Sequence, residues 1–340
     1  MLAGAAAWTI SAVRSFGHGR TGPLYAAPCR FGEGRPGAVI LTAEWQLHRA
    51  IDLTSPAHSV LFHPDGSRVV CIGRGPGAVA NIVGLRARAA RLEIRPATHR
   101  VFTGHGTYSD TGKVLHLVEE NRADGKGFVA TFDSTQGYRR IGTSQSHGIG
   151  PHQVVVLREP SVLAVCNSGR MLGHGHVGGL GSVAVIDAKN GVWEAQYTLP
   201  QSLPGLAPRH LAKSVDGTLV FGCRASEAGG EGLPLVGRID AVDGLQMYPW
   251  SSDTLAQFDN RISAVAVAPD GRHCAFTSET GHSKAIVRLS DGHIVSVRRK
   301  YGVSGVVWIE ERPRTVTTLP GSEIHGSAPV QFGPHLSAQQ

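Results

Sequence analysis

The sequence predicts an all-β protein: a seven-bladed β-propeller of the YVTN/WD40-like type, with its ring closed by N- and C-terminal strands. Three observations predict this fold. The 340 residues include 44 glycines and 19 prolines, which punctuate many short apolar runs with turns. One unit of strand, tight turn and strand recurs at intervals typical of propeller blades. No stretch keeps a helical hydrophobic period for three turns, so long helices are not expected.

The recurring unit is clearest over residues 146–169. A glycine- and proline-rich loop leads to His152, which stands at the start of an apolar strand over residues 153–157. A polar turn and a second strand over residues 162–166 follow. The corresponding first-strand positions are His58, His105, His152, His210, Ser263 and Ser304, at spacings of 47, 47, 58, 53 and 41 residues. Strands within residues 23–53 supply most of a seventh blade, and the segment around 328–332 is expected to add its missing strand.

The chain is expected to form one propeller domain over residues 21–335, between a segment 1–20 and a tail 336–340. Residues 2–10 form an apolar run that is too short to span a bilayer. The run resembles the middle of a secretory signal but lacks the preceding positive region. Three interpretations stay open: a true start further upstream, a short signal on its own, or an ordinary disordered terminus. No transmembrane span is expected.

Charge and cysteine content narrow the function classes. The net charge is +7 and aromatic residues make up 6 % of the chain. The basic residues are mostly scattered, which is typical of a solvated surface, and nucleic-acid binding would need a continuous basic face with interleaved aromatics. The five cysteines contain no C-x-x-C pair, so we expect buried free thiols that act as small hydrophobic residues.

The first strand of each propeller blade lines the central channel, so residues at its start project toward one rim. Four histidines from successive blades are therefore expected to converge there, and Ser263 and Ser304 fill the same position in two further blades as weak ligands. Three polar residues that follow second strands are expected nearby, and Arg209 lies beside one histidine. The candidate channel residues are His58, His105, His152, His210, Arg209, Glu120, Asn121 and Asn167.

Three roles are open for this set. Neutral imidazoles are common ligands of transition metals, so His58, His105, His152 and His210 are a candidate site for copper, iron or zinc. Alternatively, the histidines together with Arg209 bind an anion such as a carboxylate or phosphate. In the third interpretation each histidine bonds backbone carbonyls of its own blade around a water-filled channel. No nucleophile elbow or phosphate-binding glycine motif is present.

Five stretches of the chain resemble the bacterial propeller family called domain of unknown function 1513. They are AHSVLFHPDG (57–66), GHGTYSDTGKVLHLVEEN (104–121), GYRRIGTSQSHGIGPHQVVVL (137–157), APRHLA (207–212) and LVFG (219–222). The resemblance extends from about Pro23 to Val330. It implies a propeller that is exported to the periplasm by the twin-arginine (Tat) route, although the segment 1–20 as given contains no twin arginine. The glycine-rich loop 168–181 is shorter than the corresponding loop of relatives, and in this chain it contains histidines. The family carries no established activity.

These observations lead to one functional hypothesis and two alternatives. The hypothesis is an exported, periplasmic and non-catalytic propeller, a monomer that binds a metal ion or small ligand in its channel and presents it to a partner protein. The first alternative is a metal-dependent enzyme, either a hydrolase or lactonase or a redox protein. The second is a protein-interaction scaffold, which predicts that the channel histidines tolerate replacement by alanine.

Overall fold

The computed structural model describes residues 24–86, 91–173, 179–226, 232–309, 312–317, 331–332, 335 and 337–338. The predicted signal segment 1–20 and the pair His174 and His176 lie outside the described residues. Almost every described element is a strand, so the predicted all-β class is confirmed. The few helices are short, and none in the described segments has the length and apolar character needed to cross a bilayer. They are η1 (Gly32–Gly34), η2 (Ser134–Gln136) and α1 (Ser252–Ala256).

Strands from both ends of the chain form the first sheet, in the order β26-β1-β2-β3, with β27 also paired to β1. The strands are β1 (Tyr25–Arg30), β2 (Pro36–Leu41), β3 (Leu47–Asp52), β26 (Gln331–Phe332) and β27 (Ser337–Ala338). Cys29 pairs with Phe332, and Tyr25 pairs with Ala338. The C-terminal segment thus supplies strand partners to β1.

The next sheet has eight strands and consists of two consecutive four-stranded meanders. The first contains β4 (Ala57–Phe62), β5 (Arg68–Gly75), β6 (Ala80–Gly84) and β7 (Arg91–Ile94). The second contains β8 (Arg100–Tyr108), β9 (Val114–Asn121), β10 (Lys126–Asp133) and β11 (Arg139–Ile149). The two are joined where Arg74 and Gly75 of β5 pair with Thr103 and Phe102 of β8.

Three four-stranded antiparallel sheets and one two-stranded sheet follow. The first comprises β12 (Pro151–Arg158), β13 (Val162–Asn167), β14 (Ser182–Asp187) and β15 (Val192–Thr198). The second comprises β16 (Leu206–Lys213), β17 (Leu219–Ala225), β18 (Val236–Asp240) and β19 (Gly244–Met247). The third comprises β20 (Ala264–Val267), β21 (His273–Ser278), β22 (Ser283–Arg288) and β23 (Ile294–Arg299). The last is β24 (Val303–Ile309) with β25 (Arg312–Thr317).

Asp-Gly turns join the first two strands in several of these sheets. The side chains of Asp65, Asp216 and Asp270 each accept a hydrogen bond from the backbone N–H two residues later, at 2.8, 2.9 and 2.8 Å. The glycine that follows each aspartate has φ between 68° and 90°, a conformation that costs glycine little. The repeated turn therefore fixes the same hairpin in successive sheets.

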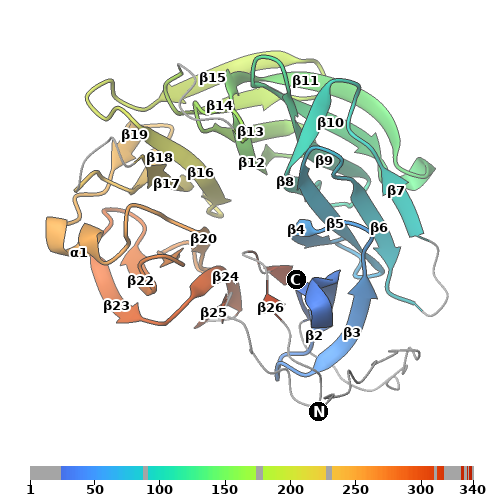
Figure 1. Ribbon diagram of the computed structural model, residues 1–340. Helices are drawn as coiled ribbons and strands as arrows, with labels where there is room; N and C mark the ends of the chain where they lie inside the picture. The colour runs from blue at the N-terminus through green and yellow to red at the C-terminus, as the bar shows by residue number, and fades with distance from the viewer. Residues whose placement is uncertain are drawn as a thin grey trace, which may run out of the picture.

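The sheets follow one another around a ring, as Figure 1 shows, with β4, β8, β12 and β16 nearest its centre. The arrangement is propeller-like. Buried apolar side chains fill the space between neighbouring sheets: Cys166 of β13, Phe221 of β17 and Phe276 of β21 belong to one core cluster. All five cysteines are buried and free, as predicted. Burial raises the pKa of the Cys71 thiol to about 12, so this thiol stays protonated at neutral pH.

Candidate functional site

The four predicted histidines stand on the innermost strands β4, β8, β12 and β16. His58 and His152 are the second residues of their strands, whereas His105 and His210 lie further along theirs. In each strand the pairing register shifts at the histidine or at the residue next to it. A β-bulge of this kind turns a side chain away from the sheet surface. The bulges thus explain how the side chains leave the pleat and meet at the centre of the ring.

The imidazole rings come into contact with one another. Ring centroids are 5.0 Å apart for His58 and His105, 4.4 Å for His105 and His152, and 5.1 Å for His152 and His210. One ring nitrogen from each of His58, His105 and His152 lies within 4.8 Å of the others. Four strands of separate repeat units therefore contribute rings to a single cluster.

A fifth histidine, His335, joins this group from the C-terminal segment. Its Nε2 lies 3.1 Å from Nε2 of His58. Its ring centroid is 4.6 Å from that of His58, 4.8 Å from that of His105 and 5.5 Å from that of His210. Sequence reasoning missed His335 because it belongs to no repeat unit. We call the five residues His58, His105, His152, His210 and His335 the imidazole cluster.

The imidazole cluster is shielded from solvent, which keeps its rings neutral. His105, His152 and His210 are only 5, 5 and 6 % exposed. Burial, reinforced by neighbouring imidazoles and arginines, holds the pKa of His58, His105, His152 and His210 well below its usual value. Burial, followed by Arg74 and Arg261, lowers the pKa of His335 to about 3. Neutral imidazoles have a free lone pair, which is the form that binds a metal.

Hydrogen bonds leave ring nitrogens of the cluster available. The buried atoms Nε2 of His105 and Nδ1 of His152 have no hydrogen-bond partner among the described residues. Gln153 donates from its amide nitrogen to the carbonyl of Leu211 at 2.8 Å, which directs its amide oxygen toward Nδ1 of His210 at 3.2 Å. His210 then donates from Nδ1, so its Nε2 carries the lone pair. Buried imidazole atoms without partners are costly unless a ligand satisfies them.

A glycine makes room for one of the rings. Gly104 has φ +97°, and a Cβ on it would lie 2.4 Å from Cδ2 of His58. Its carbonyl accepts a hydrogen bond of 2.6 Å from the Ser59 hydroxyl. Only glycine combines this backbone conformation with so close an approach. The stretch Gly104-His105 therefore both supplies one ring and accommodates another.

The remaining predicted residues have different surroundings. Asn167 is fully buried and exchanges hydrogen bonds with Ser146, at 2.7 and 2.9 Å. Asn121 accepts from the backbone N–H of Ala123 at 2.9 Å and shapes a turn. Both side chains thus have local structural contacts. Glu120 and Arg209 instead line a cavity of about 380 Å³ that also contains Thr103 and Pro151.

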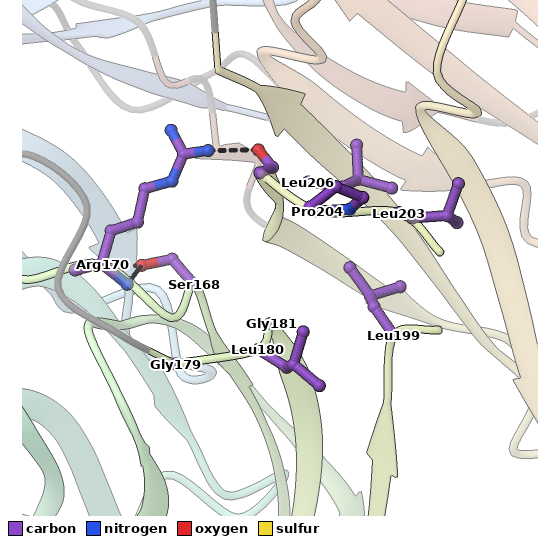
Figure 2. Close-up of a pocket in the computed structure, with 10 residues that line it drawn as sticks. Ser168, Arg170, Gly179, Leu180, Gly181, Leu199, Leu203, Pro204 and Leu206 are labelled. Atoms are coloured by element: carbon purple, nitrogen blue, oxygen red, sulfur yellow. Dashed lines mark hydrogen bonds between the residues drawn. The ribbon is translucent and has the colours of Figure 1, made fainter. Parts of the chain in front are cut away.

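A second cavity, of about 210 Å³, lies among the loops that follow β13 and β15 and has an apolar wall that includes Leu199, Leu203 and Leu206. Figure 2 shows Arg170 extending from the Ser168 side of this pocket, with a hydrogen bond to the Gly205 carbonyl on the other side. Arg170 also lines the larger cavity. The Arg170 side chain therefore lies between the two cavities.

Solved structures share the fold at low sequence identity. Hydrazine synthase of Kuenenia stuttgartiensis matches with a TM-score of 0.64 and 12 % identity, over 83 % of this chain and 89 % of that chain. A chain of the mitotic checkpoint complex gives 0.56 and 12 %, over 83 % and 74 %. Apo AztD from Citrobacter koseri gives 0.54 and 11 %, over 94 % and 99 %. The structural matches show a common propeller-like fold. At identities this low they carry no information about activity.

No curated protein matches the chain in sequence. The family model DUF1513, described as a protein of unknown function, matches residues 51–331. The matched region contains β4 to β25, and with them four of the five clustered histidines and both cavities. The chain therefore belongs to the DUF1513 family.

Proposed function

We propose that this protein binds one transition-metal ion through its imidazole cluster. The observation that carries the proposal is the convergence of His58, His105 and His152, with one ring nitrogen of each within 4.8 Å of the others. The 3.1 Å separation of Nε2 in His58 and His335 is close to the ligand–ligand distance of about 3.3 Å that tetrahedral coordination at about 2.0–2.1 Å requires. A third and a fourth ligand would come from His105 and His152, whose ring centroids lie 5.0 and 6.2 Å from that of His58.

The donor set selects the class of metal. Imidazole nitrogen suits zinc, copper and iron, whereas calcium and magnesium prefer oxygen ligands. The neutral state of the buried rings avoids competition between the metal and protons at neutral pH. The five histidines come from strands β4, β8, β12 and β16 and from the segment between β26 and β27, so a bound ion would also link these parts of the chain to one another.

The proposal includes the wider setting of the site. The fold is a seven-bladed propeller in which β26 and β27 complete the sheet of β1 and close the ring. The protein is exported to the periplasm, as the family resemblance implies, and presents its ion to a partner protein without catalysing a reaction. A metal-dependent enzyme and a protein-interaction scaffold are the alternatives.

The test is metal titration of the purified, metal-stripped protein with zinc, copper, iron and manganese, with cobalt absorption as a report of nitrogen ligation. We expect one equivalent of metal in the wild type. The variants His105→Ala and His152→Ala should weaken binding at least tenfold, because each removes a nitrogen that no described residue satisfies. The matched control is His48→Ala, an exposed position on β3, which should bind as the wild type does.

Two results would reject the site: no retained metal in the folded wild type, or metal binding as tight as that of the wild type in both His105→Ala and His152→Ala. The first would favour the scaffold alternative. If a metal binds as expected, hydrolytic and redox assays on the loaded protein separate the non-catalytic proposal from the enzyme alternative.

A further inference from the structure

The 380 Å³ cavity beside the imidazole cluster has an unusual lining. Five of its residues are arginines, and its only acidic residue among the described ones is Glu120. We call it the arginine chamber. Its arginines are Arg74, Arg170, Arg209, Arg224 and Arg261. They come from β5, the loop after β13, β16, β17 and the segment before β20, so only the assembled ring brings them together.

Most of this positive charge has no hydrogen-bonded or ion-pair partner among the described residues. The side chains of Arg74, Arg209 and Arg224 make no hydrogen bond or ion pair with any residue that the structure describes, and Nε of Arg209 is buried. Arg170 donates to the backbone carbonyl of Gly205. Arg261 lies 3.8 Å from the Glu279 carboxylate. Collecting like charges in a partly buried cavity is unfavourable unless an anion compensates them.

The electrostatics of the chamber reflect this excess. Burial, followed by repulsion from the other four arginines, lowers the pKa of Arg209 to about 9, so the group remains charged at neutral pH. Burial also lowers the pKa of Arg74 and of Arg261. Burial raises the pKa of Glu120 to about 7, although Leu172 donates its backbone N–H to that carboxyl at 2.8 Å. The one acidic group in the chamber is therefore partly neutral at physiological pH.

The size and the donors of the chamber define what it can hold. We propose that the arginine chamber is a binding site for a small polyanion, a molecule with two or more carboxylate or phosphate groups. A cavity of this volume lies in the usual range of small-molecule sites. Guanidinium groups pair bidentately with carboxylate and phosphate oxygens. Because the five guanidinium groups surround the cavity, a ligand with several anionic groups can pair with more of them than a monovalent anion can.

The chamber is adjacent to the imidazole cluster. Its lining residues Thr103, Pro151 and Arg209 come one or two positions before His105, His152 and His210 on the same strands. The Thr103 hydroxyl also lies 3.5 Å from the carbonyl of His152. The polyanion site is nevertheless a different site with different donors, and it does not require a metal.

Calorimetric titration of the metal-free protein in a chloride buffer tests the proposal. Tricarballylate and pyrophosphate distinguish a polycarboxylate from a phosphate ligand, and acetate is the monovalent comparison. We expect one equivalent of at least one polyanion to bind, and acetate to bind at least tenfold more weakly. Arg209→Gln and Arg224→Gln should each weaken polyanion binding about tenfold or more, because each loses a charge-assisted interaction. The control is Arg299→Gln, an exposed position on β23, which should not change it.

Arg224 is exposed, so its variant keeps the test valid if Arg209→Gln folds poorly. The proposal is overturned if neither polyanion binds to the folded wild type, or if both chamber variants bind as the wild type does. His152→Ala should lose metal but keep polyanion binding, so failure at one site is distinguishable from failure at the other.

The pH dependence supplies a second readout. The charged groups that face Glu120 in the chamber are the five arginines, which keep their charge throughout. Ionisation of Glu120 as the pH rises through about 7 adds a negative charge to the cavity, so polyanion affinity should fall over that range. Glu120→Gln should bind more tightly than the wild type above pH 7, and the difference should shrink at pH 6. Measuring both proteins at each pH cancels the titration of the ligand, and identical pH profiles would contradict the proposal.

Discussion

A chain that ends after Val330 is expected to lose several kcal/mol of unfolding free energy and to aggregate. The truncation removes β26 and β27, which pair with β1 at Cys29, Arg30, Tyr25 and Ala26. At about 1 kcal/mol for each hydrogen bond, four residue pairs account for a loss of this size. The truncation also leaves one edge of β1 unpaired, and such an edge is a template for pairing with other chains. Urea denaturation and light scattering measure the two effects.

The matched comparison is His335→Ala in the full-length chain, which removes the fifth imidazole and keeps both short strands. This variant should unfold close to the wild-type midpoint while its metal affinity falls. If the truncated chain unfolds at the wild-type midpoint without aggregation, β26 and β27 do not stabilise the ring, and the proposed closure is wrong.

Replacing Glu119 with alanine is expected to lower the free energy of unfolding by about 3–5 kcal/mol, the range for breaking a buried ion pair. Glu119 is fully buried and is held by Arg140 at 2.5 Å, by Arg100 at 3.3 Å and by the backbone N–H of Ala97 at 3.2 Å. Arg100 in turn lies 3.5 Å above the Phe128 ring. Without the carboxylate, two partly buried guanidinium groups lose their counter-charge. Chemical denaturation measures the loss.

Asp124→Ala is the control for this variant. Asp124 forms an exposed ion pair of 3.0 Å with Lys126, and exposed pairs contribute little, so no measurable change is expected. Glu119 and Glu120 are neighbours on β9 and point to opposite faces of the strand. Polyanion binding by the folded fraction of Glu119→Ala should therefore be unchanged. If Glu119→Ala is as stable as the wild type, Arg100 and Arg140 do not need the Glu119 carboxylate as a counter-charge.

The residue pattern by itself determined the fold class and the strands that carry the four predicted histidines. Asp-Gly turns and short apolar runs act locally, so their spacing is visible in the chain: the turns at Asp65, Asp216 and Asp270 lie where the repeat places them. The same repeat assigned His58, His105, His152 and His210 to equivalent first strands. The specific stretch 137–157 indicated the family, and the family match confirms it.

Only the tertiary structure decided which other side chains reach the centre. His335 lies outside every repeat. It reaches His58 from the segment between β26 and β27, the two C-terminal strands that pair with β1. Of the chamber arginines, the sequence singled out Arg209 beside a predicted channel histidine. The other four appeared as scattered surface charge, because they come from second strands and loops of different sheets. Bulges redirect side chains without leaving a hydrophobic signature, so the repeat could not show their final directions. Turn residues act on their neighbours in the chain and can be recognised from the sequence. Convergence of side chains at the centre depends on contacts between residues far apart in the chain.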